Sequence, residues 1–191
     1  MLSSYVKRLN EGLGTVSDEL IKQFCDLLFN AWLDNRSVFL CGNGGSAGNA
    51  IHLANDFVYG ISKSRGRGLK CHALPANQSV MTCLANDVGY EHVYAEQVAL
   101  YGKKGDLLII LSGSGNSANI INAAKEARLR GMYVIALVGF DGGYVSQLAD
   151  LVIHSKIEDM QISEDIQLVI GHVVMQYLYE RRNEVGRQED L

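Results

Sequence analysis

Five short, uninterrupted apolar runs recur along this chain of 191 residues, and most of the stretches between them are long enough to hold a helix. Each run is apolar at odd and even positions alike, which predicts strands covered on both faces, as in a parallel sheet. The runs are Val38 to Cys41, Leu69 to Leu74, Leu107 to Leu111, Tyr133 to Val138 and Leu151 to His154. We therefore predict an α/β fold with a doubly wound, flavodoxin-like, five-stranded parallel sheet, whose ligands bind in the loops after the strands.

Helical periodicity flanks these runs at both ends of the chain. It predicts a short amphipathic helix across Tyr5 to Leu13, a longer one across Ser17 to Asn35 with Ser17 as N-cap, and a last helix across Gln161 to Arg182. The apolar faces of the N-terminal and last helices are broader than one sheet contact requires. Two interpretations stay open, helix packing between subunits and burial of one flank of the monomer.

The length predicts a single domain, because a domain holds ~150 residues. We assign residues 1–35 to the N-terminal helices, 36–182 to the α/β sandwich and 183–191 to a frayed tail.

The charge balance and the apolar runs exclude several classes of protein. A formal net charge of −4 argues against a general nucleic-acid partner. The longest apolar runs hold about five residues, whereas a membrane-spanning helix needs ~20. The N-terminus lacks the apolar segment of a secretory signal. These features predict a cytoplasmic protein with neither a nucleic-acid nor a membrane partner.

Two strand-to-helix turns repeat each other without a gap. FLCGNGGSAGN at 39–49 aligns with ILSGSGNSAN at 110–119. Glycines let backbone amides approach a ligand, and the free amides of a helix N-terminus attract anions, so each turn suits a phosphate. A capping turn explains a single such loop equally well, but the pair favours phosphate binding. The dinucleotide and ATP-binding glycine patterns are both missing, which argues against those ligands.

The ordered set of motifs resembles the SIS (sugar isomerase) domain family and, within it, the phosphoheptose isomerases. The likeness covers nearly the whole chain. It rests on CGNGGS at 41–46, the helix with His52 to Asp56, AND at 85–87, SGSGNSAN at 112–119 and GFDGG at 139–143. The resemblance implies a homotetrameric, cytoplasmic aldose–ketose isomerase. Its reaction would convert sedoheptulose 7-phosphate to D-glycero-D-manno-heptose 7-phosphate for heptose-containing surface glycans of the lipopolysaccharide or capsule type.

The resemblance also implies which residues contact the sugar phosphate. They come from both loops, the AND triplet and the last helix: Asn43, Gly44, Gly45, Ser46, Asn86, Asp87, Ser112, Gly113, Ser114, Ser117 and Glu164. For Asn86 and Asp87 a capping turn is the alternative interpretation.

Aldose–ketose isomerisation moves a proton between C1 and C2 through an enediol, so it needs one group that takes a proton and one that returns it. His52 and Asp56 lie four residues apart on the helix after the first loop and so share a face. By the resemblance, Asp56 takes the place of the catalytic Glu and His172 that of the catalytic His. We expect Asp56 and His172 to be the catalytic pair, with either one as the base.

A zinc ion is the expected cofactor, one per subunit, because some family members carry zinc. His52, Asp56, Glu164 and His172 offer two imidazoles and two carboxylates, which zinc accepts. Glu164 takes the place of a family Gln, yet it lies about 12 Å from His172 along an ideal helix. The two would have to reach inward or belong to different subunits. Asp165 shares the face of His172 better, so the choice between Glu164 and Asp165 stays open.

Two positions depart from the family pattern. Gly113 stands where the family usually has Thr, and Gly60 where it usually has Arg, which removes a hydroxyl and a positive charge from the expected site. The rival hypothesis is a non-catalytic protein, because the SIS family also contains phosphosugar sensors and a regulator that binds a replication-initiator protein. Retention of His52, Asp56 and His172 favours the enzyme.

Overall fold

A five-stranded sheet forms the centre of the structure, a computed structural model that describes residues 1–185. All neighbouring strands are parallel, and their order is β2-β1-β3-β4-β5. The strands are β1 (Ser37–Gly42), β2 (Lys70–Ala73), β3 (Leu107–Ser112), β4 (Tyr133–Val138) and β5 (Leu151–His154). The predicted doubly wound sheet is confirmed, and each predicted run matches its strand to within one residue at either end.

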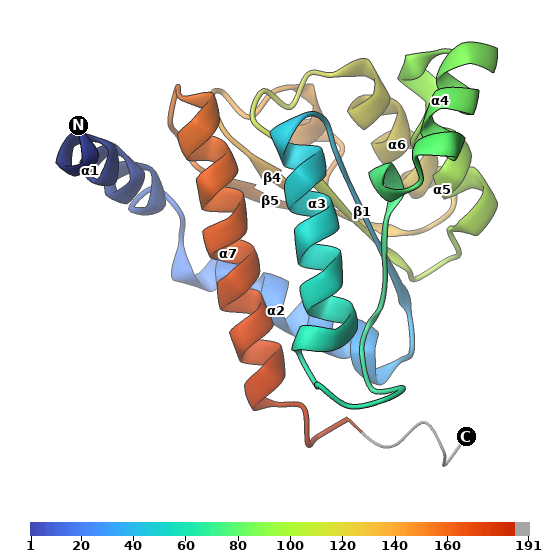
Figure 1. Ribbon diagram of the computed structural model, residues 1–191, viewed down its shortest axis with the longest axis horizontal. Helices are drawn as coiled ribbons and strands as arrows, with labels where there is room; N and C mark the ends of the chain where they lie inside the picture. The colour runs from blue at the N-terminus through green and yellow to red at the C-terminus, as the bar shows by residue number, and fades with distance from the viewer. Residues whose placement is uncertain (186–191) are drawn as a thin grey trace.

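Helices cover both faces of this sheet (Figure 1). One face carries α2 (Asp18–Leu33), α3 (Gly45–Asn55), the π-helical turn Asp56–Gly60 that continues α3, and α7 (Met160–Glu180). The other face carries α4 (Gln78–Asp87), α5 (Ala95–Tyr101) and α6 (Ala118–Leu129). Among residues 1–185, no helix combines the length and the apolar character that a membrane span requires.

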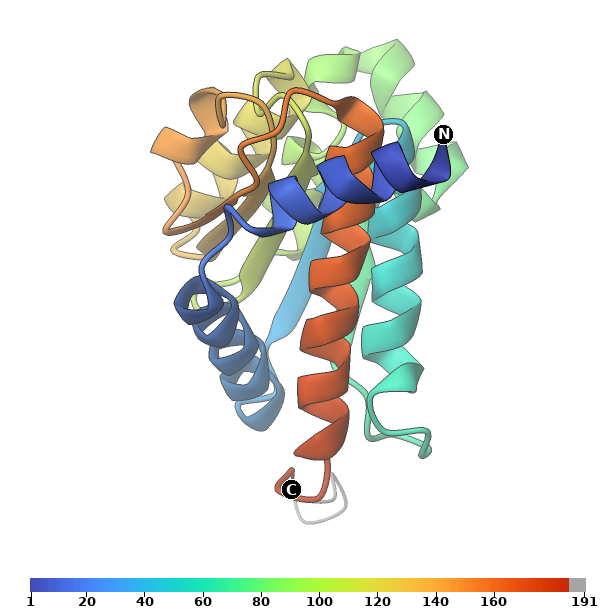
Figure 2. The same cartoon turned by 90° about the vertical axis from the view of Figure 1, so that its left-hand side faces the viewer.

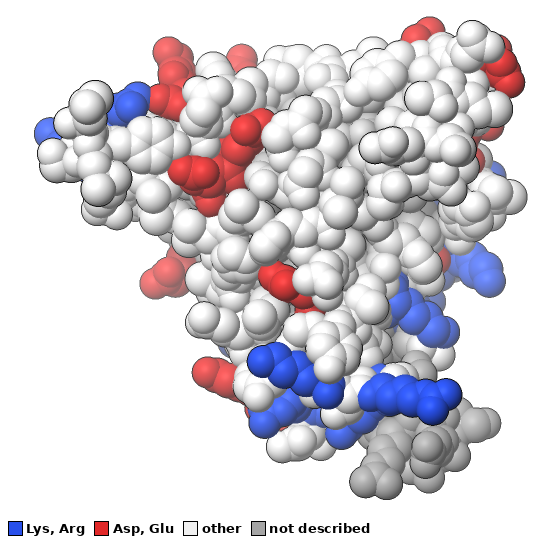
Figure 3. Space-filling view, viewed as in Figure 1, with Lys and Arg blue, Asp and Glu red and all other residues white. Residues whose placement is uncertain are grey.

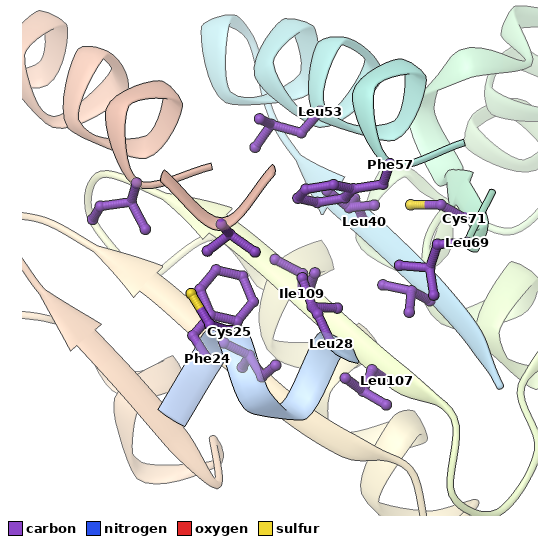
Figure 4. Packing of buried hydrophobic residues seen from close by; sticks show 14 of the residues in the cluster. Phe24, Cys25, Leu28, Leu40, Leu53, Phe57, Leu69, Cys71, Leu107 and Ile109 are labelled. Atoms are coloured by element: carbon purple, nitrogen blue, oxygen red, sulfur yellow. The ribbon is translucent and has the colours of Figure 1, made fainter. Parts of the chain in front are cut away.

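Successive residues of the central strands alternate between two apolar cores. Leu40 of β1 and Ile109 of β3 face α2 and α3, and Figure 4 shows them packed near Leu28 and Leu53. Their neighbours in sequence, such as Leu108, join the core beneath α5 and α6. Because both faces are covered, every position of these strands is buried except the first of β1, which explains why the sequence runs are apolar at both parities.

The predicted terminal helices are present with slightly shifted ends. Ser17 is the N-cap of α2, as predicted, and its Oγ accepts the N–H of Glu19 at 3.2 Å. Asp159 caps α7 in the same way, since its Oδ1 accepts the N–H of Ile162 at 3.1 Å. These caps satisfy amides that a helix N-terminus leaves free.

Helix α1 (Leu2–Leu13) extends sideways from the body of the molecule (Figures 1 and 2). It is attached at the start of α7, where the Tyr5 hydroxyl donates to Asp165 at 2.7 Å and Arg8 pairs with Asp159. The bond to the Asp165 carboxylate raises the pKa of Tyr5 to about 12. Helix α1 is therefore tied to the element that also carries His172.

The chain after α7 corrects part of the tail assignment. Arg67 donates to the carbonyl oxygens of Arg182 and Val185 at 2.9 and 2.7 Å, and Val185 is buried. Residues 183–185 therefore form an anchored turn and not a frayed end, because the Arg67 guanidinium donates hydrogen bonds to carbonyl oxygens on both sides of the turn. Residues 186–191 of the predicted tail lie outside the described residues.

The winding of the sheet reverses between β1 and β3. From β1 the chain crosses to β2 on one side, while β3 lies on the other side of β1. The loops that follow β1 and β3 therefore lie next to each other at the carboxyl edge of the sheet. Ligands of doubly wound proteins bind at such a reversal.

Candidate active site

The first glycine-rich loop joins β1 to α3. A Cβ on Gly42 would lie 2.7 Å from the carbonyl oxygen of Ser46 and 2.8 Å from that of Leu111, so only glycine fits this close approach. Gly44 has a φ of 56° with open space around its Cβ position, and α3 begins at Gly45. Ser46 itself is buried. The backbone of this loop is thus more available to a ligand than its serine.

The second loop joins β3 to α6 and is backed by glycines that follow β4. Ser112 Oγ accepts the N–H of Gly115 at 3.0 Å, and a Cβ on Gly115 would lie 2.3 Å from the carbonyl oxygen of Gly142. Ser114 and Ser117 are half-buried, and Ser117 is the N-cap of α6 without using its hydroxyl as a cap. This rigid turn offers hydroxyls and helix amides together, a donor set that suits an anion.

A reciprocal pair of amides joins the two loops. Asn43 and Asn119 each donate to the side-chain oxygen of the other at 2.9 Å, and the Tyr90 hydroxyl donates to Asn43 at 3.0 Å. Asn43 was predicted to contact substrate, but its side chain is engaged in this link. Sequence analysis did not single out Asn119 or Tyr90. Asn119 lies inside the repeated motif, whereas no sequence signal connects Tyr90 to Asn43.

His52, Asp56 and His172 converge between α3 and α7. His52 Nε2 lies 3.0 Å from His172 Nε2, and Asp56 Oδ2 lies 3.4 Å from His52 Nε2 and 3.5 Å from His172 Nε2. The helices approach closely at Gly171, where a Cβ would lie 2.2 Å from Leu53 Cδ2. The histidine side chains are 51 and 45 % exposed and that of Asp56 is 16 % exposed, so a ligand can reach all three. The predicted catalytic pair is thus in contact.

The three converging side chains fit a metal ion. Their ligand atoms all lie within 4.8 Å of one another. Tetrahedral zinc with bonds of 2.0–2.1 Å separates its ligand atoms by about 3.3 Å, close to the three distances above. Two imidazole nitrogens 3.0 Å apart also need a shared proton or a shared cation between their lone pairs. The donor set therefore suits zinc with one coordination position open.

Glu164 does not join this cluster, which corrects the predicted set of four metal ligands. Its carboxylate lies over the N-terminus of α3, where a Cβ on Gly45 would be 2.3 Å from Glu164 Oε2. Asn49 donates to the Glu164 carbonyl oxygen at 2.9 Å, which fixes this turn of α7 against α3. Asp165 points instead to Tyr5 on α1. Eight residues of helix separate Glu164 from His172, so both cannot reach one ion in the same protomer.

Asn86 and Asp87 form the exposed end of α4. Asn86 donates to Asp87 Oδ1 at 2.8 Å, and Cys83 Sγ donates to Asp87 Oδ2 at 3.4 Å. The bond to the carboxylate raises the pKa of the Cys83 thiol. Both predicted residues are accessible to a ligand, although they belong to a helix end.

Gly60 leaves space beside Asp56. A Cβ there would lie 3.7 Å from Asp56 Oδ1 and 3.7 Å from Met175 Cε, an ordinary contact distance. Residue 60 thus faces the cluster of His52, Asp56 and His172, and no side chain of its own fills this space.

A well-formed, mostly apolar cleft lies elsewhere in the molecule. A cleft of about 830 Å³ opens between α2 and α6, at the amino edge of the sheet, and it is lined by residues such as Ala31, Leu107 and Leu129. It contains neither glycine loop nor the His52, Asp56 and His172 cluster. The convergent acid, base and metal-ligand groups that a reaction requires lie instead in the cluster of His52, Asp56 and His172.

Comparison with known proteins identifies the same fold. A model of the SIS domain matches residues 3–139. The phosphoheptose isomerase of Pelodictyon phaeoclathratiforme is 39% identical over 90% of this chain and 82% of that protein, and that of Helicobacter pylori is 36% identical over 82% and 81%. The solved phosphoheptose isomerase of Neisseria gonorrhoeae is 30% identical and superposes with a TM-score of 0.86 over 94% of this chain and 95% of that one. The chain belongs to the SIS-domain family of phosphoheptose isomerases.

Proposed function

We propose that this protein is an isomerase that interconverts sedoheptulose 7-phosphate and D-glycero-D-manno-heptose 7-phosphate. The observation that carries the proposal is the contact of Asp56 Oδ2 with His172 Nε2 at 3.5 Å, on helices that begin at the carboxyl edge beside both glycine loops. A carboxylate and an imidazole in contact are the acid and base that an enediol reaction needs. The rival regulator hypothesis is not favoured, because the relatives compared are phosphoheptose isomerases.

The proposed reaction needs one base and one acid from the chain. In the ketose-to-aldose direction, one member of the pair Asp56 and His172 removes a proton from C1, and the other protonates O2, which gives the enediol. Return of a proton to C2 and loss of the proton from O1 then give the aldose. His52 orients the pair through its contacts with both side chains.

His52, Asp56 and His172 would hold zinc in this proposal. When bound, zinc supplies polarisation of the sugar oxygens at C1 and C2. The second carboxylate oxygen of Asp56, Oδ1, accepts a hydrogen bond from Asn55 at 3.3 Å. One oxygen of this carboxylate can therefore coordinate a metal ion while the other accepts a proton.

The spacing of the site suits a long sugar phosphate. His52 follows Gly45 by seven residues on α3, which corresponds to about 10 Å at ~1.5 Å per residue. About seven skeletal bonds of ~1.5 Å separate the carbonyl carbon of sedoheptulose 7-phosphate from its phosphorus. An extended heptose phosphate is therefore long enough to cover the interval from the first loop, beside which the second loop lies, to the cluster, whereas a pentose phosphate is shorter by two carbons.

We also propose a homotetramer. Apolar side chains are exposed on the helices around the cluster and on the projecting α1: Leu2, Val6, Ile51, Val58, Tyr59 and Val173. Figure 3 shows that most of this face is uncharged, with a few acidic side chains on it and basic side chains gathered at its lower end. Exposed apolar surface of this kind suits subunit contacts. Light scattering after size-exclusion chromatography tests the proposal, and a monomeric mass would reject it.

A cytoplasmic location is part of the same proposal. Cys25, Cys41 and Cys71 are buried free thiols, and burial raises the pKa of Cys25 to about 11, so these thiols stay protonated. Buried thiols of this kind suit a reducing compartment. There the product would supply a pathway to heptose-containing surface glycans.

A direct assay tests the proposed activity. Purified protein is incubated with sedoheptulose 7-phosphate, with and without added zinc, and aldose formation is followed by NMR. The doubly substituted Asp56→Asn/His172→Ala protein serves as the control, with folding checked by circular dichroism. Aldose from the unmodified protein alone supports the proposal. Equal turnover in both proteins, or none in either, would reject it.

A further inference from the structure

We infer that Met160 forms a wall of the substrate pocket that recognises the carbon chain next to the phosphate, and that residue 113 is glycine because the Met160 thioether occupies its side-chain space. This inference rests on the proposed function, since it adds a specificity-determining residue to that site. It uses the second glycine loop, which has the more complete set of anion donors.

The Met160 thioether occupies the space that a side chain on residue 113 would need. A Cβ on Gly113 would lie 2.5 Å from Met160 Sδ and 3.1 Å from Met160 Cε. The next atom in reach is Cε2 of Phe140, at 3.6 Å. Gly113 has no positive φ among the described backbone angles, so its conformation does not require glycine. The neighbouring thioether is therefore the group that a side chain at residue 113 would have to displace.

The positions of both neighbours are set by the backbone. Met160 is the first residue of α7, directly after the N-cap Asp159, whose main-chain oxygen also accepts the Ser163 hydroxyl at 2.8 Å. Phe140 has a φ of 47°, and its carbonyl oxygen contacts His154 Nε2 at 2.9 Å. Two anchored residues thus bring apolar atoms to one point of the second loop.

Met160 is nevertheless not a core residue. It is 39% exposed, although it lies beside a loop whose side chains, from Ser112 to Ser117, are all polar. A flexible thioether at the mouth of a site is adaptable apolar surface. Beside the donors that take the phosphate, such a surface fits the methylene and neighbouring carbons of the bound sugar. Inorganic phosphate has no such carbons, which gives the inference a specific test.

The test is a double-mutant cycle of Gly113→Ala, Met160→Ala and both together. The Met160 sulfur is near the free end of its side chain, so Gly113→Ala should displace it without unfolding the loop. Each single variant should raise KM for sedoheptulose 7-phosphate by about 3- to 10-fold with little change in kcat, and the double variant should be no worse than the poorer single one. Leu129→Ala, which shortens another exposed apolar side chain, at the amino edge, is the control.

Calorimetry separates this inference from the proposed function. Affinity for inorganic phosphate should stay within about twofold in Met160→Ala, while affinity for sedoheptulose 7-phosphate falls as KM rises. If the unmodified protein binds the sugar phosphate without turnover, the proposed function fails and the affinities still decide the role of Met160. Additive effects in the cycle, equal losses for both ligands, or no loss in Met160→Ala would overturn the inference. So would an unmodified protein that does not bind the sugar phosphate.

Discussion

The two glycine loops share a sequence pattern but differ in what surrounds them. The second loop is enclosed, with Gly115 packed against Gly142 and a hydroxyl of Ser112 inside the turn. The first loop is open at Gly44 and lies beside the carboxylate of Glu164. The repeat therefore gives both loops a similar backbone, and neighbours from other elements make them different.

Charge extends this difference to function. The first turn of α6 contains no acidic residue, so its N-terminus is free to attract an anion. The N-terminus of α3 already faces Glu164, which offsets the same attraction. We expect the second loop to hold the phosphate, and the first loop to guide the sugar toward His52 and Asp56 on α3.

Loss of the carboxylate in Asp56→Asn should have the largest effect, since it removes a proton-transfer group from the first-loop side of the site. We expect kcat to fall by about 10²- to 10⁴-fold. Affinity for inorganic phosphate, measured by calorimetry, should not change. A parallel loss of phosphate affinity would mean that phosphate binding and proton transfer are not separated between the two loops.

Serine substitutions compare the loops directly. Ser114→Ala and Ser117→Ala should each raise KM by about 10- to 100-fold, because a hydrogen bond to a charged group contributes ~1.5–3 kcal/mol. Ser46→Ala in the first loop should have a much smaller effect, because Ser46 is buried. Steady-state kinetics on the three variants decides the matter. If Ser46→Ala proves the most damaging, the assignment of phosphate to the second loop is wrong.

Zinc affinity tests the corrected ligand set. His52→Ala should weaken zinc binding by at least about tenfold, because it removes one of three convergent ligands. Glu164→Gln is the matched comparison and should leave zinc affinity unchanged, since Glu164 lies at Gly45. Titration with a zinc-selective dye measures both. Weaker binding in Glu164→Gln would restore the four-ligand prediction, with Glu164 supplied by another subunit.

Much of the fold follows from the sequence, because the burial of β1 and β3 on both faces leaves an uninterrupted apolar run. The placement of His52 and Asp56 on one face follows from their spacing. The sequence does not decide, however, whether Glu164 or Asp165 points toward the site. The choice depends on how α7 is rotated against α3, and that rotation is set by the contact of Gly171 with Leu53.

Long-range partners escape sequence analysis for the same reason. Tyr90 reaches Asn43, and Arg67 reaches the carbonyl oxygens of Arg182 and Val185, across large separations in the chain. Local periodicity carries no information about such pairs. The expected role of His172 came from the resemblance to a family, whereas the nearness of Met160 to Gly113 appears only in the structure.

The smallest expected effect concerns the charge at the first loop. Glu164→Gln removes the carboxylate over the N-terminus of α3 and keeps the size of the side chain. A carboxylate near a helix N-terminus contributes ~0.3–1 kcal/mol, so its loss should let the first loop bind inorganic phosphate about two- to fivefold more tightly. Asp165→Asn removes a charge one residue away, but it faces Tyr5 and should leave phosphate affinity unchanged. Calorimetry at low ionic strength compares the two. If both variants gain affinity for phosphate equally, the lower net negative charge of the protein explains the result. The contrast between the two loops then has no electrostatic basis.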